Sequence, residues 1–428
     1  MPDVMSDAPA VTDAPAHVAH QATRTRAGRR TRTASFALNV SILAALLAAS
    51  SAPTPLYPLY QDQWGLSALA VTVVFSAYAL ALLLALLTTG ALSDHLGRRP
   101  VLAGALLIAA ASMVLLASAD GASSLAIARV LQGAATGAAT SAAGAALLDL
   151  ENPRRPGRSA LANSVTPVAG MATGVLVSTL LVRFAPTPTV TVYVLLAALF
   201  LAQAIAATFT TETAHRHAGA LPSLRPRVSI PLPARRTLLA AGVAVGAVWA
   251  LGGFYSSLSP ALVHLVAPDA PQTARGMVFF TLSATAALTV WALRRRPPRA
   301  TAIGGCMSVL PAAALTLSGL HGTGLPAVYG GAALAGIAFG AVSQGVLRML
   351  LASLDERDRA ATLAAYYILS YLSMSLPAVA AGAATQHYGL GTTSHAYSIT
   401  AALLALAALA ALTASRRGAA RPEADRSH

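Results

Sequence analysis

The stretch Gly90-Ala91-Leu92-Ser93-Asp94-His95-Leu96-Gly97-Arg98-Arg99-Pro100 separates two long apolar runs, residues 68–89 and 100–118. Its two glycines, one acidic residue and two arginines predict a tight polar turn between two helices. Gly90 allows two helices to approach closely, and Pro100 suits the first turn of the helix that follows. Asp94 and Arg98 carry opposite charges within reach of neighbouring helix ends, where a carboxylate favours a helix N-terminus.

The apolar runs on either side of this turn are typical of the whole chain. Of 428 residues, 56% are hydrophobic and only 10% are charged, and the mean hydropathy is +0.63. A soluble globular protein carries about 25% charged residues. The charged residues are too few to cover a soluble surface, which excludes a cytosolic enzyme, a disordered scaffold and a secreted disulfide-rich domain. The sequence predicts a protein embedded in the lipid bilayer.

Apolar runs long enough to cross a membrane, about 20 residues each, recur along the chain. Twelve are expected: 36–56, 68–89, 100–118, 124–148, 160–182, 188–208, 238–260, 276–293, 300–319, 325–347, 361–384 and 395–414. The only long connection, 209–237, divides them into two sets of six. We therefore expect an all-α membrane protein with six-helix bundles over 36–208 and 238–414. The other parts are a disordered basic tail (1–35), a linker (209–237) and a short tail (415–428).

The positions of the basic residues predict the orientation of these spans. All 29 are arginines. With the N-terminus in the cytoplasm, 25 lie on the cytoplasmic side and only Arg183 and Arg275 on the other, as the positive-inside rule requires. We expect both termini in the cytoplasm of a cell with a bacterial-type inner membrane, and no nucleic-acid partner. Arg29-Arg30 before an apolar run could also belong to a twin-arginine export signal, but eleven further spans favour a first membrane helix.

Three motifs together resemble a known family. The stretch Gly90–Pro100 matches nearly every position of the loop signature of the major facilitator superfamily, between the second and third spans. Arg129-Val130-Leu131-Gln132-Gly133 in the fourth span resembles the family's Arg-x-x-Gln-Gly motif. Pro167 with Gly170 and Gly174 is similar to the glycine–proline motif of the exporter branch, although Asn163 and Thr166 stand where glycines are usual. The resemblance covers about residues 36–414 and is greatest to drug:proton antiporters.

The resemblance implies roles for two groups of residues. The first would form a charge network that closes the cytoplasmic gate: Gly90, Asp94, Gly97, Arg98, Arg99 and Asp149. The alternative is solvated loop charges without coupling. The second group, Pro167, Gly170 and Gly174, would bend a helix. For the glycines the alternative is that they only let helices pack closely.

A central cavity formed by the first, fourth, seventh and tenth spans is also implied by the resemblance. Residues expected on the substrate or proton pathway are Asn39, Arg129, Gln132, Trp249, Gln344 and Tyr367. Arg129 is the only charged residue well inside an apolar run. It could face the cavity and bond Gln132 or polar groups of the first span, or it could reach the outer interface. Tyr57, Tyr60 and Tyr255 suit an interfacial aromatic belt.

The resemblance implies a secondary transporter that works by alternating access and exports its substrate, with the proton gradient as its energy source. The few charges among the expected cavity residues predict small, moderately hydrophobic substrates. We expect a monomer without cofactor or metal, since Cys306 is the only cysteine and no ligand cluster is evident. No carboxylate lies in the middle of a span, so the proton carrier is open among Asp62, Asp94, Asp149 and His264. The nearest alternative is a metabolite or sugar importer or uniporter. A membrane sensor would be expected to carry a large soluble domain, and the longest connection, 209–237, is too short to fold as one. An enzyme would need a catalytic group of residues, and none is evident in the sequence.

Overall fold

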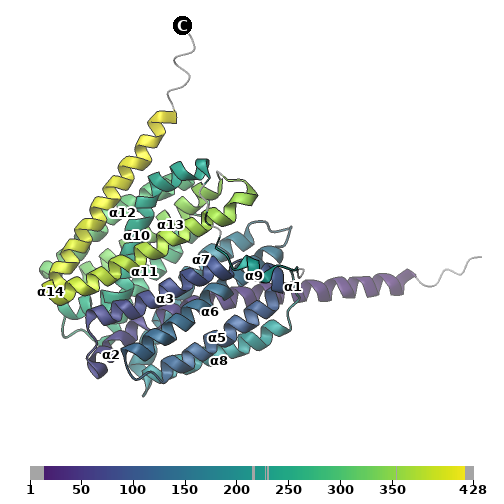
Figure 1. The fold of residues 1–428 in the computed structure, drawn as a ribbon, viewed down its shortest axis with the longest axis horizontal. Helices are drawn as coiled ribbons and strands as arrows, with labels where there is room; N and C mark the ends of the chain where they lie inside the picture. Colours follow the sequence, from purple (N-terminus) through teal and green to yellow (C-terminus); the bar gives the residue numbers. More distant parts are fainter. Residues whose placement is uncertain (1–13, 215–216, 227, 229–230, 353, 420–428) are drawn as a thin grey trace, which may run out of the picture.

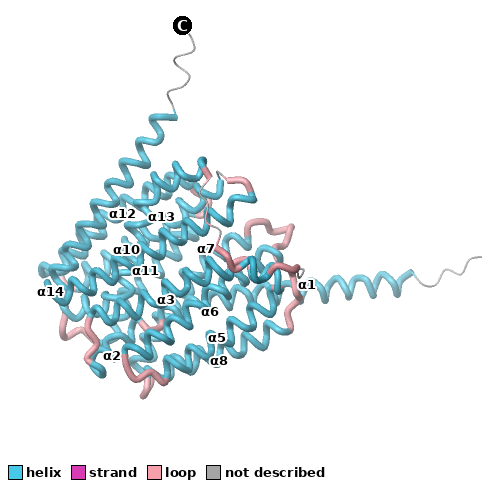
Figure 2. Tube along the Cα trace, viewed as in Figure 1, coloured by secondary structure: helices cyan, strands magenta, loops and turns pink. Residues whose placement is uncertain are grey.

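Helices account for all the regular secondary structure in the residues that the computed structural model describes (Figure 2). These residues are 14–214, 217–226, 228, 231–352 and 354–419. The first half of the chain contains α1 (Ala14–Ser51), η1 (Thr54–Leu56), α2 (Tyr57–Trp64), α3 (Ala68–Thr89), α4 (Leu92–Leu96), α5 (Arg98–Ala117), α6 (Ala122–Asp149), α7 (Arg158–Phe184) and α8 (Pro188–Thr208). After the short α9 (Ala220–Ser223), the second half contains α10 (Leu232–Val266), α11 (Gln272–Leu293), α12 (Pro298–Ser318), η2 (Gly319–Thr323), α13 (Leu325–Ala352) and α14 (Glu356–Ala419).

Ten helical segments among the described residues are long and apolar enough to cross a membrane, which makes the chain an integral membrane protein. The last of them, Asp358–Ala414, has 57 residues, far more than one crossing needs. Gly389 interrupts it with a φ of +77°, a backbone conformation that suits glycine. The 28-residue helix α6 is not among the ten, and it contains the charged residue Arg129.

The N-terminal region differs from the expectation. Residues 1–35 were expected to be disordered, but α1 begins at Ala14 and runs without a break into the first apolar run. Alanine and arginine both favour helix, so a basic tail of this composition can extend the helix beyond the apolar run. In Figure 1 this extension of α1 projects to the right, away from the other helices. Residues 1–13 lie outside the described part of the chain.

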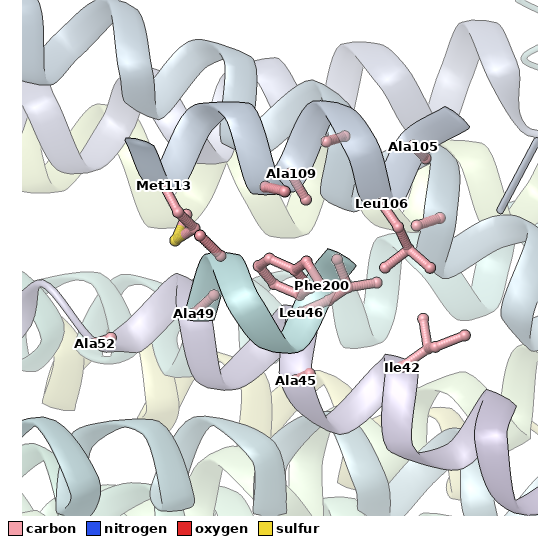
Figure 3. Packing of buried hydrophobic residues seen from close by; sticks show 14 of the residues in the cluster. Ile42, Ala45, Leu46, Ala49, Ala52, Ala105, Leu106, Ala109, Met113 and Phe200 are labelled. Atoms are coloured by element: carbon pink, nitrogen blue, oxygen red, sulfur yellow. The ribbon is translucent and has the colours of Figure 1, made fainter. Parts of the chain in front are cut away.

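The apolar side chains form two large buried clusters, one in each half of the chain. In the first, Leu46 of α1, Leu106 of α5 and Phe200 of α8 are at most 1% exposed and meet in the space between their helices (Figure 3). Since lipid tails are as apolar as these side chains, close packing holds such helices together rather than the exclusion of water.

Pairs of glycines show that the two halves repeat one packing arrangement. Gly133 and Gly137 of α6 lie against the backbone of α3 at Tyr78 and Leu82. In the second half, Gly336 and Gly340 of α13 lie in the same way against the backbone of α11, at Leu282 and Ala286. A side chain at Gly137 or Gly340 would come within 2.6 Å of the facing carbonyl oxygen, so both contacts require glycine.

The two halves meet through α3 with α14 and through α7 with α11. Thr54 donates a hydrogen bond to the carbonyl oxygen of Ser256 (3.0 Å), and Ser76 donates to that of Ser375 (3.2 Å). Gly276 of α11 lies against Pro55 and Thr179 of the first half. These contacts lie toward the end of the molecule that carries η1 and α2, which we call the Pro55 end. In Figure 1, α1 extends to the right and the end of α14 to the top, so the two halves point in different directions away from the Pro55 end.

Candidate substrate site and polar network

Arg98, the first residue of α5, joins two of the acidic residues that were expected to pair with it. Its guanidinium forms an ion pair with Asp94 of α4, and its Nε donates to Oδ2 of Asp149, 3.2 Å away at the end of α6. Its Nη1 also donates to the hydroxyl of Ser93 (2.7 Å). The Arg98 side chain is only 12% exposed, against 55% for Asp94 and 33% for Asp149. The structure thus brings these three residues together. With Glu212, which is described next, they form what we call the Asp94 network.

Glu212, in the connection after α8, completes this network and was missed in the sequence. Its Oε1 accepts from the backbone N–H of Arg98 (2.7 Å) and its Oε2 from that of Arg99 (3.1 Å). These N–H groups begin α5 and have no partner within the helix, so Glu212 caps α5. Burial acts to raise the pKa of this carboxyl, but hydrogen bonds from the backbone of Ala214, Arg98, Arg99 and Thr213 outweigh it and lower the pKa.

Gly97 explains why the chain can place Glu212 there. Its φ is +101°, and a side chain at this position would come within 2.6 Å of Oε2 of Glu212. Both the backbone conformation and the space therefore require glycine. The other predicted members contribute through the backbone: Arg99 donates its N–H to Glu212, and the carbonyl oxygen of Gly90 accepts from the hydroxyl of Ser141 on α6 (2.9 Å).

Further contacts hold α1 and the linker to the same place. Arg32 donates to the carbonyl oxygens of Glu151 (2.7 Å) and Leu150 (3.3 Å), which lie where α6 ends and where a cation is favourable. Thr213 donates its hydroxyl to Oδ2 of Asp149 (2.9 Å). The start of the linker is therefore fixed to the first half, at the end of the molecule opposite the Pro55 end.

Arg129 lies inside the first half and is fully buried. Its Nη1 donates to Oε1 of Gln132 (2.5 Å) and to the carbonyl oxygen of Ser50 (3.3 Å). Gln132 in turn donates to the carbonyl oxygen of Ala49 (2.9 Å), so both side chains of α6 bond α1. The guanidinium carbon lies 4.1 Å from the centre of the Tyr78 ring. These contacts fit the expectation that Arg129 bonds Gln132 and the first span, and they disagree with the alternative that it reaches an interface.

The polar groups of Arg129 are not all satisfied. Its Nε and Nη2 are buried and have no hydrogen-bond partner among the described residues. No ion pair of Arg129 is found among the described residues, where every Asp and Glu lies in the short helices α2 and α4, within three residues of the end of a longer helix, or in a connection. A buried cation without a counterion is costly in a membrane and usually marks a functional site.

Aromatic side chains connect this site to the second half. Tyr371 of α14 packs against the buried cluster of Tyr78, Ala79 and Leu82 on α3. The Tyr371 ring lies 5.2 Å from that of Trp249 on α10 and 6.3 Å from that of Tyr367. Trp249 also contacts Phe339 of α13, at 5.3 Å between ring centres. Trp249 and Tyr367, two predicted pathway residues, thus lie in one aromatic cluster, which meets the first half at Tyr78, Ala79 and Leu82 through Tyr371.

Two other predicted pathway residues form hydrogen bonds within their own halves of the chain. Asn39 is buried and donates to the carbonyl oxygen of Ser35 in its own helix (2.9 Å). Gln344 donates to the carbonyl oxygen of Val290 on α11 (3.1 Å). Neither contacts the Arg129 site in the described structure.

The expected aromatic belt is wrong for Tyr57, Tyr60 and Tyr255, since each is only 2% exposed. Tyr60 bonds Tyr193 and Tyr255 bonds Thr316, so their hydroxyls are satisfied within the protein rather than at an interface.

Gly170 and Gly174 lie against the backbone of α1 at Ala44 and Ala48, which fits the close-packing alternative. Pro167 lies inside the uninterrupted helix α7.

Known proteins resemble this chain in sequence and in fold. The family model described as Major Facilitator Superfamily matches residues 38–376. None of the curated proteins matches the sequence. Among solved structures, a bacterial homologue of the human lysosomal transporter Spinster, in an inward-facing and unoccupied conformation, is similar with a TM-score of 0.74 at 15% identity, over 90% of this chain and 98% of that one.

Two further solved structures are similar in fold. The human organic anion transporter MFSD10 (TETRAN) has a TM-score of 0.64 at 20% identity, over 89% of this chain and 99% of that one. The nucleoside transporter NupG has a TM-score of 0.65 at 13% identity, over 88% and 98%. At these identities the likeness concerns the fold.

Proposed function

The chain belongs to the major facilitator superfamily and is a transporter rather than an enzyme; on that premise we propose that it exports small, moderately hydrophobic molecules from the cell in exchange for protons. In this proposal the chain crosses the membrane twelve times. Ten crossings come from the segments named above, with α6 as an eleventh and the break at Gly389 dividing the last segment into two. Both termini then lie in the cytoplasm, as does the Asp94 network.

The observation that carries the proposal is the buried, uncompensated Arg129 beside an aromatic cluster shared by both halves. A substrate with an apolar body would pack on the rings of Tyr78, Tyr371 and Trp249. A hydrogen-bond acceptor on that substrate would satisfy the free N–H groups of Arg129, which otherwise carry a desolvation cost. Specific recognition then comes from a few polar groups in a mostly apolar site.

The positions at which the halves touch support alternating access. The hydrogen bonds of Thr54 and Ser76 to the second half lie at the Pro55 end, whereas the Asp94 network joins elements of the first half and the linker. We propose that the Pro55 end is closed in this conformation and that the Asp94 network holds α4, α5 and α6 as one rigid unit. When the halves rock, this unit would meet the second half and close the cytoplasmic side.

A second candidate is a proton-independent carrier of metabolites in the same superfamily. It is favoured by the position of the described carboxylates, which all lie outside the middle of the helices, because proton coupling commonly uses a buried carboxylate. Its substrates could include organic anions, since Arg129 would bind an anionic group strongly.

The decisive experiment is transport into proteoliposomes with an imposed pH gradient, across a panel of apolar compounds, organic anions and nucleosides. Export coupled to protons predicts accumulation of an apolar compound against its gradient, which disappears when the pH gradient is collapsed. Uptake that only equilibrates and is indifferent to the pH gradient would instead establish the second candidate.

A further inference from the structure

The connection between α12 and α13 and the last part of α14 place two histidines side by side. Nε2 of His321 lies 3.3 Å from Nε2 of His395, and the two ring planes are nearly perpendicular, at 89°. His321 is exposed and His395 is half-buried, so an ion in the surrounding water can reach the pair. The pair lies far from Arg129 in the sequence and contributes nothing to the site described above.

The contacts of the other ring nitrogens indicate which tautomer each histidine adopts when it is neutral. Nδ1 of His321 lies 2.8 Å from the carbonyl oxygen of Leu317, and Nδ1 of His395 lies 2.7 Å from that of Gly391. A carbonyl oxygen can only accept, so both Nδ1 atoms carry the proton and donate it. In the neutral imidazole the remaining nitrogen, Nε2, is then an acceptor with a free lone pair.

Two neutral acceptors at 3.3 Å cannot hydrogen-bond each other, so the pair favours an electrophile between the two nitrogens, which is either a metal ion or a proton. Two imidazole nitrogens bound to a tetrahedral Zn²⁺ at 2.0–2.1 Å lie about 3.3 Å apart. A histidine that binds a metal also typically donates its other N–H to a backbone carbonyl or carboxylate, as both rings do here. The distance and the tautomers thus both match a metal site.

We propose that His321 and His395 bind a transition-metal dication of the kind that prefers imidazole, such as Zn²⁺, Ni²⁺ or Co²⁺. Mg²⁺ and Ca²⁺ prefer oxygen ligands and are not expected to bind. No third His, Cys, Asp or Glu completes a larger cluster in the part of the chain that the structure describes, so water or an external ligand fills the other positions.

The local backbone holds the two rings in place. His321 is followed by Gly322 with a φ of +108°, which turns the chain immediately after the ligand. His395 follows the break in α14 at Gly389 by six residues. A bound ion would therefore tie the α12–α13 connection to the start of the last helical segment, within the second half. No metal was expected from the sequence, because Cys306 is the only cysteine and no ligand cluster is evident. His321 and His395 lie 74 positions apart and form no local motif.

The test is a calorimetric titration of the full-length protein with zinc chloride. The protein is purified by means of an affinity tag that contains no histidine. We expect one saturable site, weakened at least tenfold in His321→Ala and in His395→Ala. The matched control is His387→Ala, an exposed histidine on the same helix that should leave the site unchanged. Cobalt(II) should give the visible absorption of a tetrahedral ion in the parent protein only, and magnesium chloride should give no binding.

Melting temperatures measured in EDTA distinguish a lost ligand from a lost fold. The proposal requires that zinc raise the melting temperature of the parent and of His387→Ala, but not that of folded His321→Ala. Equal zinc binding in parent and His321→Ala would overturn it. The proposal would also be overturned if the two histidines bind protons but not zinc. In that case the melting temperature would depend on pH only when both histidines are present, and zinc would not change it. Neither result bears on the transport proposal, which does not involve these residues.

Discussion

The guanidinium carbon of Arg129 on α6 lies 4.1 Å from the centre of the Tyr78 ring on α3. An aromatic face attracts a cation, and the attraction is strongest where water is excluded. Tyr78 belongs to a small buried cluster with Ala79 and Leu82, against which Tyr371 and Met374 of the second half pack, so the buried charge lies close to the contact between the halves. Movement of the halves relative to each other would change the surroundings of Arg129 directly.

Replacing Arg129 should therefore impair transport while the protein still folds. We expect Arg129→Ala to lower the transport rate at least tenfold, which corresponds to about 1.4 kcal/mol. Arg129→Lys should restore little, because an ammonium that bonds Gln132 and Ser50 keeps only one further N–H, whereas Arg129 still offers the N–H groups of Nε and Nη2 to a substrate. The measurement is initial flux in proteoliposomes at equal protein content. Arg183→Ala, at an exposed arginine, is the control; unchanged kinetics in Arg129→Ala would remove Arg129 from the substrate site.

The Asp94 network predicts that two acidic residues act through the same arginine. Asp94→Asn and Asp149→Asn should each impair transport several-fold with expression preserved, because each loosens one side of Arg98. The double variant should be less impaired than the product of the two effects, since the residues share one partner. Asp269→Asn, an exposed acid outside the network, should transport normally. Full activity in Asp94→Asn would show that the network is not part of the gate.

Glu212 predicts a pH dependence of stability. Its pKa is lowered in the folded protein, so its contribution is present above the unfolded pKa, near 4.5, and is lost as the pH falls through the folded value. Glu212→Gln should lower the melting temperature at pH 7 by a few degrees, and this difference should shrink below about pH 4. A difference that is independent of pH would mean that the charge of Glu212 does not stabilise the start of α5.

The proposed orientation predicts which connections react from outside the cell. Cys306 is buried and can be replaced by serine to give a background without cysteine. In that background, Thr187→Cys should react with a membrane-impermeant maleimide in intact cells. Arg155→Cys should react only after the cells are permeabilised, because it lies in the connection next to the Asp94 network. The reverse pattern would invert the orientation and with it the position of the gate.

The sequence was informative where a residue type is rare or a motif is local. Arg129 stood out because it is a charge within an apolar run, and its bond to Gln132 spans only three residues. Asp94 and Arg98 lie four residues apart in one turn. All twelve expected spans correspond to helices or parts of helices, the last two both to α14. Hydropathy alone marks eleven of them, within ten segments, and leaves out only α6.

The residues that the sequence did not reveal are those whose partners lie far away along the chain. Glu212 caps a helix that begins 114 residues earlier, and an acid in a polar linker gives no sign of that role. In the sequence, Tyr78 is one of several aromatic residues in apolar runs. Its place beside the second half becomes visible only in the structure, where α3 packs against α14. The belt expected for Tyr57, Tyr60 and Tyr255 was wrong for the same reason, since the depth of a residue in a run does not show which side of the helix is buried.

The central claim is that transport requires the two halves to move apart at the Pro55 end. It is tested most directly by joining them there. In the cysteine-free background, Ser76→Cys with Ser375→Cys places two thiols where α3 and α14 touch. Ser41→Cys with Gln203→Cys joins α1 and α8 within the first half as a control.

With a substrate identified in the proteoliposome panel, oxidation should stop flux through the Ser76–Ser375 variant, and reduction should restore it. The control should transport equally before and after oxidation. Undiminished flux through a fully cross-linked Ser76–Ser375 variant would contradict the account.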